Sequence, residues 1–106
     1  MVKIAICDDN RTYVDEIKRI TEAFLCTQVT DFEVDSYYDS QEIYNSNSIY
    51  DMAFLDIEMP GYSGIEVAKK LQSLNPHIII FIITSYNKYL DDAMDLNVFR
   101  YIQKPL

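Results

Sequence analysis

Acidic, hydroxyl and ammonium side chains follow the apolar runs of this chain. Asp8 and Asp9 follow VKIAIC, Asp56 follows MAFL, Thr84 closes IIIFII, and Lys104 follows VFRYIQ. If these runs are parallel strands of one sheet, all five side chains lie at its carboxyl edge, where open α/β sheets bind ligands. Three carboxylates, a hydroxyl and an ammonium can together hold a divalent cation and a phosphoryl group.

Such carboxylates repel one another unless a cation lies among them. Two unit charges about 4 Å apart interact with roughly 4 kcal/mol at an effective dielectric near 20. Mg2+ prefers oxygen ligands and keeps several waters. We predict that Asp9 and Asp56 bind Mg2+ directly, that the backbone carbonyl of Glu58 is a third ligand, and that Asp8 acts mainly through water.

Asp56 is also placed to accept a phosphoryl group. A carboxylate can form an acyl phosphate when the charge is neutralised and the groups are in line. Mg2+ would cover one side of the phosphoryl oxygens and the Lys104 ammonium another, while the Thr84 hydroxyl could donate to the third oxygen.

Each of these residues has an ordinary structural explanation when it is taken alone. Asp8 and Asp9 could cap a helix, Asp56 could belong to a Pro-Gly turn, and Lys104 could be a solvated edge-strand charge. These explanations do not account for five such groups at the same end of successive strands.

The apolar periodicity predicts alternating strands and helices. Strands are expected at 2–7, 31–38, 52–56, 78–84 and 98–104, and helices at 10–25, 39–45, 63–74 and 88–96. The first helix carries Val14, Ile17, Ile20 and Phe24 at helical spacing. Capping-box spacing marks two helix starts, in the pairs Ser63 and Glu66, and Asp39 and Glu42.

The strand order follows from burial. Runs 52–55 and 77–84 are apolar throughout and suit central strands, whereas 31–38 and 98–104 alternate with charged or polar residues and suit edges. With right-handed crossovers, this predicts a flavodoxin-like, doubly wound α/β fold with a five-stranded parallel sheet in the order 2-1-3-4-5.

Composition narrows the function classes. The chain has 106 residues and a net charge of -8, which suits one globular domain and argues against direct binding to nucleic acid. No run is long enough to cross a membrane and no signal peptide is evident, so we expect a cytoplasmic protein. Cys7 and Cys26 lack metal-site spacing and are expected to be reduced, mostly buried thiols.

The chain resembles the receiver domain of two-component response regulators over almost its whole length. The resemblance rests on the Asp8 and Asp9 pair, FLDIEMPGYSGIEVAKKL around Asp56, TS at Thr84, and YIQKP around Lys104. Within that family, DIEMPG and FRYIQKPL are most similar to receivers of LytTR-type transcription regulators.

This resemblance implies a switch. Asp56 would take its phosphoryl group from the phosphohistidine of a histidine kinase, and Thr84 and Tyr101 would be the switch pair that remodels the face of the fourth helix and fifth strand. Phosphorylation would thereby shift the population between two states. The resemblance also implies a cis bond between Lys104 and Pro105.

The resemblance also sets expectations for the rest of the protein. The sequence stops at Leu106, where the family has a fifth helix, so we read 1–106 as a receiver domain truncated before that helix and before an output domain of LytTR type that would bind DNA. Homodimerisation on phosphorylation is left open.

Other functions remain alternatives to the receiver. An Asp-nucleophile phosphatase or phosphotransferase would have Glu58 two residues after its nucleophile, but 106 residues leave no room for a cap domain. A flavodoxin-like FMN carrier would need a phosphate-cradling first loop in place of the acidic DDNRT. The third alternative is a protein with the receiver fold that signals without phosphorylation. We expect no turnover of an external substrate.

Overall fold

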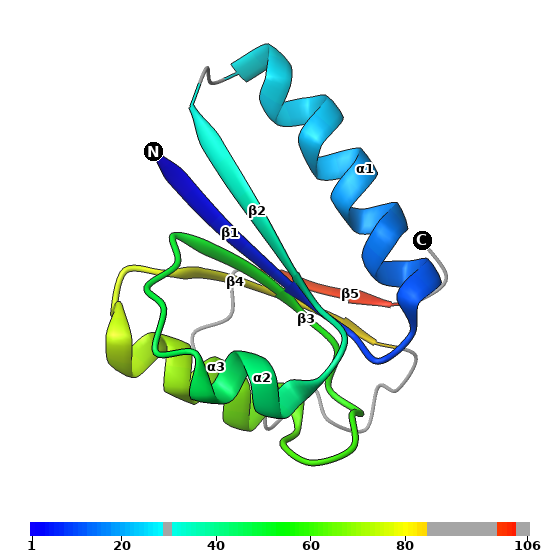
Figure 1. Cartoon of the computed structure of the whole chain (residues 1–106), viewed down its shortest axis with the longest axis vertical. Coiled ribbons are helices and arrows are strands. Elements are labelled where there is room, and N and C mark those ends of the chain that lie inside the picture. The colour runs from blue at the N-terminus through cyan, green and yellow to red at the C-terminus, as the bar shows by residue number, and fades with distance from the viewer. Residues whose placement is uncertain (29–30, 85–99, 104–106) are drawn as a thin grey trace.

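One parallel sheet with helices on both faces makes up the computed structural model (Figure 1). The structure describes residues 1–28, 31–84 and 100–103. The sheet order is β2-β1-β3-β4-β5, which confirms the predicted order and the flavodoxin-like class. The strands are β1 (Val2–Cys7), β2 (Phe32–Tyr37), β3 (Met52–Leu55), β4 (Ile79–Thr84) and β5 (Arg100–Gln103).

Three helices lie within the described residues. Helix α1 (Arg11–Gln28) covers one face of the sheet, and α2 (Ser40–Asn45) and α3 (Gly64–Leu74) lie side by side on the other (Figure 1). The capping box at Ser63 is present, and Asp39 caps α2 by accepting a hydrogen bond from the Gln41 amide at 2.8 Å. The helix predicted at 88–96 lies outside the described residues.

Alternating strand residues build a core on each face of the sheet. On the α2 and α3 side, the largest fully buried residues include Tyr50, Leu55, Ile80 and Ile82. On the α1 side, the buried cluster is smaller and contains Ile6, Val14, Ile17 and Ile83. The strands that pattern analysis predicts as central, β3 and β4, contribute to both cores, as expected of strands covered on both faces.

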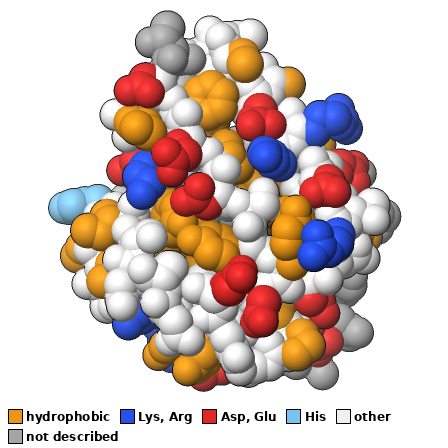
Figure 2. Space-filling view, viewed as in Figure 1, with side chains coloured by type: hydrophobic (Ala, Val, Ile, Leu, Met, Phe, Trp, Pro, Cys, Tyr) orange, Lys and Arg blue, Asp and Glu red, His pale blue; other side chains and the backbone are white. Residues whose placement is uncertain are grey.

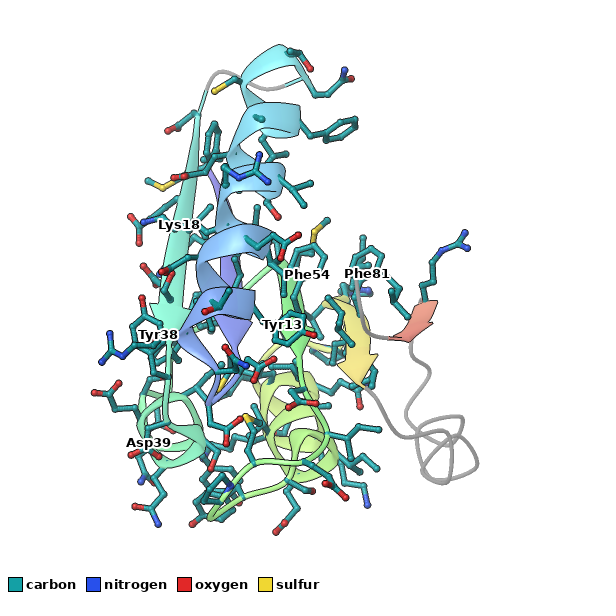
Figure 3. All side chains as sticks on the ribbon, turned by 90° about the vertical axis from the view of Figure 1, so that its right-hand side faces the viewer. Tyr13, Lys18, Tyr38, Asp39, Phe54 and Phe81 are labelled. Atoms are coloured by element: carbon teal, nitrogen blue, oxygen red, sulfur yellow. The ribbon has the colours of Figure 1, made fainter. Side chains whose placement is uncertain are left out.

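The second half of α1 corrects two expectations. Ile20 and Phe24 have helical core spacing but are 49% and 63% exposed, and Cys26 is exposed rather than buried. For Ile20 and Phe24, the cause is an open apolar groove of about 360 Å³ between α1 and strands β3 to β5, in which Phe54 and Phe81 stack with ring centroids 4.8 Å apart (Figure 3). Ile20 and Phe24 line this groove and are not covered from outside.

The described surface agrees with the acidic composition. On the face seen in Figure 2, Lys and Arg side chains stand among Asp and Glu side chains and do not form a continuous basic patch. Among the helices that the structure describes, none combines the length and the apolar character that crossing a membrane would require.

Candidate metal centre

Three carboxylates meet where β1 and β3 end. The strands are adjacent and in register, with Cys7 opposite Leu55, so the residues that follow them emerge side by side. The Asp56 amide donates to the Cys7 carbonyl at 3.1 Å, which fixes this alignment beyond the last paired residues. One carboxylate oxygen from each of Asp8, Asp9 and Asp56 lies within 4.8 Å of the other two. The predicted convergence of these three acids is therefore confirmed.

The three acids differ in their exposure to solvent. Asp8 and Asp56 are only 2% and 7% exposed, whereas Asp9 is exposed. The Asn10 amide donates to Asp8 Oδ1 at 2.9 Å, and Asn10 Oδ1 accepts from the Thr12 amide at 3.0 Å at the start of α1. The chain thus turns from strand to helix directly at the acidic pair, leaving Asp9 at the solvent side of the cluster.

The loop after β3 folds back on Asp56. The Gly64 amide donates to the Ile57 carbonyl at 2.9 Å, so the first turn of α3 lies against the backbone of the acidic residue. A Cβ atom at Gly64 would lie 2.0 Å from the Asp56 carbonyl oxygen, so any residue other than glycine would clash with the backbone here. Farther along the loop, Gly61 adopts φ +83, a conformation that favours glycine. Both glycines are required by the shape of this loop.

Two buried sulfur atoms belong to residues close in sequence to the acids. Cys7 Sγ donates to Met59 Sδ at 3.5 Å, and both residues are buried. Burial, followed by the negative charges of Asp8, Asp39, Asp56 and Asp9, raises the pKa of the Cys7 thiol to about 12. Because a neutral thiol is a poor metal ligand, the cluster offers oxygen ligands, the set that Mg2+ and Ca2+ prefer.

A pocket of about 310 Å³ adjoins the cluster on the α2 side. Its wall includes Asp9, Tyr38, Ser40 and Gly61. The Arg11 guanidinium lies 4.1 Å from the centroid of the Tyr38 ring, which follows β2 at the same edge of the sheet. Figure 3 shows Tyr38 and Asp39 at this end of β2. Solvent and small solutes can therefore approach the acids from this side.

The structure describes the other predicted site residues in part. Thr84 is the last residue of β4 and pairs with Gln103, which places its backbone at the same edge of the sheet as the acids. Tyr101 lies in β5 opposite Ile82. Glu58 is half-buried in the loop after Asp56. Lys104 and Pro105, with their predicted cis bond, lie outside the described residues.

Sequence patterns do not single out two residues that shape this site. Ser40 is fully buried, and its hydroxyl donates to the Pro60 carbonyl at 2.6 Å and accepts from the Tyr62 amide at 2.9 Å. Gly64 allows the close approach of α3 to Asp56. A glycine inside the first turn of a helix costs helix stability, which is the one sequence signal that could have drawn attention to Gly64.

Comparison with known proteins matches the chain to one family. The family description "Response regulator receiver domain" fits residues 4–106. The transcriptional regulatory protein NatR of Bacillus subtilis (strain 168) is 33% identical over 107 residues, covering 99% of this chain and 44% of NatR. The sensory transduction protein LytT of Bacillus anthracis is 32% identical over 106 residues, covering 99% of this chain and 42% of LytT.

The chain is also similar to solved structures of response regulators. The response regulator TrrA of Thermotoga maritima superposes with a TM-score of 0.80 at 27% identity, covering 100% of this chain and 89% of TrrA. The chain spans less than half the length of NatR and LytT, which places the match in one part of those regulators. The chain belongs to the response regulator receiver domains of two-component systems, a family in which phosphorylation of an aspartate is typical.

Proposed function

We propose that this receiver is a Mg2+-dependent phosphoacceptor and that Asp56 takes the phosphoryl group. The observation that carries the proposal is the convergence of three carboxylates within 4.8 Å at the ends of two adjacent strands. Two charges at that separation repel by about 3.5 kcal/mol at an effective dielectric near 20. Because Asp8 and Asp56 are almost fully buried, a bound cation offsets this repulsion better than solvent does.

The ligand set suits a hard cation. Asp9 and Asp56 would bind Mg2+ directly, the Glu58 carbonyl would be a third ligand, and Asp8 would act mainly through water. Bound Mg2+ would supply charge neutralisation on the phosphoryl oxygens. Because Asp9 is exposed, water and an incoming phosphoryl group would be able to reach a cation held there. TrrA offers a precedent, since its structure is described as a complex with Mg(2+)-BeF.

The transfer reaction uses Asp56 as the nucleophile. One carboxylate oxygen of Asp56 forms a bond to phosphorus while the P–N bond of a kinase phosphohistidine breaks and the imidazole leaves with the electron pair. Lys104 would neutralise a further phosphoryl oxygen, and the Thr84 hydroxyl would donate a hydrogen bond to another. We propose that the domain turns over no external substrate, because receivers are in general signalling modules rather than enzymes.

Phosphorylation would remodel the face formed by the fourth helix and the fifth strand. Thr84 and Tyr101 would form the switch pair, and their strands β4 and β5 are neighbours in the sheet. We propose that the partners are a histidine kinase and an output domain that binds DNA, in a cytoplasmic transcription regulator similar to LytT and NatR. The cis bond before Pro105 and homodimerisation on phosphorylation belong to the same proposal.

Removing Asp9 tests the metal site. We expect Asp9→Asn to weaken Mg2+ binding, because one of the two proposed direct carboxylate ligands loses its charge. Mutating a residue that only hydrogen-bonds to a metal ligand costs roughly 10- to 100-fold in affinity, and the loss of a direct ligand should cost at least as much. Calorimetric titration with Mg2+, followed by beryllofluoride, measures both steps. Asp31→Asn is the matched control, since Asp31 is exposed at the opposite end of the sheet beside the N-terminal amine. Equal Mg2+ affinity in wild type and Asp9→Asn would contradict the ligand assignment.

We also propose that a fifth helix, following residue 106 in a longer protein, covers the apolar groove beside α1. The groove is lined by side chains such as Phe24, Phe54, Phe81 and Ile102, and NatR and LytT are more than twice as long as this chain. In the longer protein, Phe24→Ser should lower the free energy of unfolding by about 1.5–3 kcal/mol, the value of a buried large apolar side chain. In the 106-residue chain, where Phe24 is 63% exposed, the same change should have a much smaller effect in urea unfolding. Equal effects in both chains would exclude this helix from the groove.

A further inference from the structure

Helix α2 contacts the loop that leaves Asp56 at two points. Ser40, the first residue of α2, bonds both to the Pro60 carbonyl and to the Tyr62 amide. One turn later, the Tyr44 ring stacks on Tyr62 with centroids 3.7 Å apart and planes 8° apart. Two side chains of α2 therefore hold the tip of the loop: the Ser40 hydroxyl binds its backbone, and the Tyr44 ring packs on the ring of Tyr62.

The Ser40 hydroxyl fits this loop tip closely. It is buried, with 1% of the residue exposed, and its two bonds are to the residues on either side of Gly61. A Cβ atom at Gly61 would lie 3.0 Å from Ser40 Oγ and 3.3 Å from Gln41 Cγ. The turn at Gly61 is thus closed against the start of α2, with little free space between them.

The two ends of the loop are fixed separately from its tip. The Asp56 amide bonds to the Cys7 carbonyl, and the Gly64 amide bonds to the Ile57 carbonyl. Between these anchors, the chain carries Glu58, whose carbonyl is the proposed third ligand of Mg2+. Met59, next to Glu58, is buried and accepts a hydrogen bond from the Cys7 thiol, so the geometry of the loop between its fixed ends depends on this contact and on what holds its tip.

We propose that Ser40, assisted by Tyr44, is a positioning residue that holds the 57–63 loop in the geometry required for Mg2+ binding beside Asp56. This inference rests on the proposed phosphoacceptor function and adds α2 to the elements that set the affinity of the site. Ser40 is not among the proposed ligands. It acts through the loop, as outer partners of metal ligands do.

Mg2+ titration of four proteins tests the proposal. The 106-residue chain is compared with Ser40→Ala, Tyr44→Leu and Ser46→Ala by calorimetry. Ser46→Ala is the matched control, because Ser46 follows the same helix and its hydroxyl donates to the Ile43 carbonyl at 2.8 Å and accepts from the Ser48 amide at 3.3 Å, two partners outside the 57–63 loop. We expect about tenfold weaker Mg2+ binding in Ser40→Ala, a smaller loss in Tyr44→Leu, and wild-type affinity in Ser46→Ala.

The experiment distinguishes a change in the position of the loop from a loss of stability of the whole domain. Thermal unfolding of each protein gives its folded fraction, and Mg2+ affinity is compared only where that fraction is complete. Unchanged affinity in both Ser40→Ala and Tyr44→Leu, or an equal loss in Ser46→Ala, would overturn the proposal. If the wild-type chain itself bound no Mg2+, the phosphoacceptor function would fail instead, so the two failures are distinguishable.

Discussion

Replacing Asp56 by Asn is expected to abolish phosphorylation completely while leaving the fold intact. The amide lacks the anionic oxygen that attacks phosphorus, yet it has nearly the shape of the carboxylate and occupies the same buried position, 7% exposed. Removing one of three clustered negative charges should also stabilise the metal-free protein, because the repulsion between the acids falls. Intact-protein mass after incubation with acetyl phosphate measures the first effect, and thermal unfolding without Mg2+ measures the second.

Asp39→Asn serves as the control for Asp56→Asn. Asp39 lines the pocket beside Asp9 but does not belong to the cluster of three acids, and Asn is as good an N-cap as Asp. The control protein should gain one phosphoryl group as wild type does. A persistent gain of mass in Asp56→Asn would mean that another residue is the acceptor.

Gly64→Ala is expected to destabilise the domain by about 3 kcal/mol or more. The added Cβ would lie 2.0 Å from the Asp56 carbonyl oxygen, 2.7 Å from its carbonyl carbon and 2.9 Å from Ile57 Cα. All three are backbone atoms of the loop at the site, so no side chain can rotate away to make room. Helix α3 must move instead, and phosphorylation at Asp56 should fall with it. Urea unfolding gives the free energy of unfolding, and the mass assay gives the activity.

Gly61→Ala is the comparison for Gly64→Ala. At Gly61 the cost comes from φ +83, about 1–2 kcal/mol for a residue with a Cβ atom, and from a 3.0 Å approach to Ser40 Oγ. The loss of stability should therefore be smaller than for Gly64→Ala. If Gly64→Ala unfolded at the same urea concentration as wild type, α3 would not lie against Asp56 as the structure has it.

The strand order and the acidic cluster are predictable from the sequence because both follow from local patterns. Continuous apolar runs mark central strands, alternating runs mark edges, and parallel strands bring their carboxyl ends to one edge. Asp8 and Asp56 each follow such a run directly and Asp9 follows Asp8, so the meeting of the three acids needs only the sheet order.

The features that the sequence does not predict depend on contacts between segments that are distant along the chain. Helical spacing shows that Ile20 and Phe24 share a face, but it does not show whether that face is covered, and here it borders an open groove. Ser40 looks in the sequence like any small residue at a helix start. Its role comes from Pro60 and Tyr62, about twenty residues away, and no local pattern reports that contact.

The most direct test of the phosphoacceptor is the intact mass of the wild-type chain after incubation with acetyl phosphate, with and without Mg2+. We predict a gain of one phosphoryl group that requires Mg2+, is lost on treatment with hydroxylamine and maps to Asp56. A gain that is independent of Mg2+, or that maps to a residue other than Asp56, would contradict the proposed site. No gain under either condition, in this chain and in a longer one, would contradict phosphorylation as its signal.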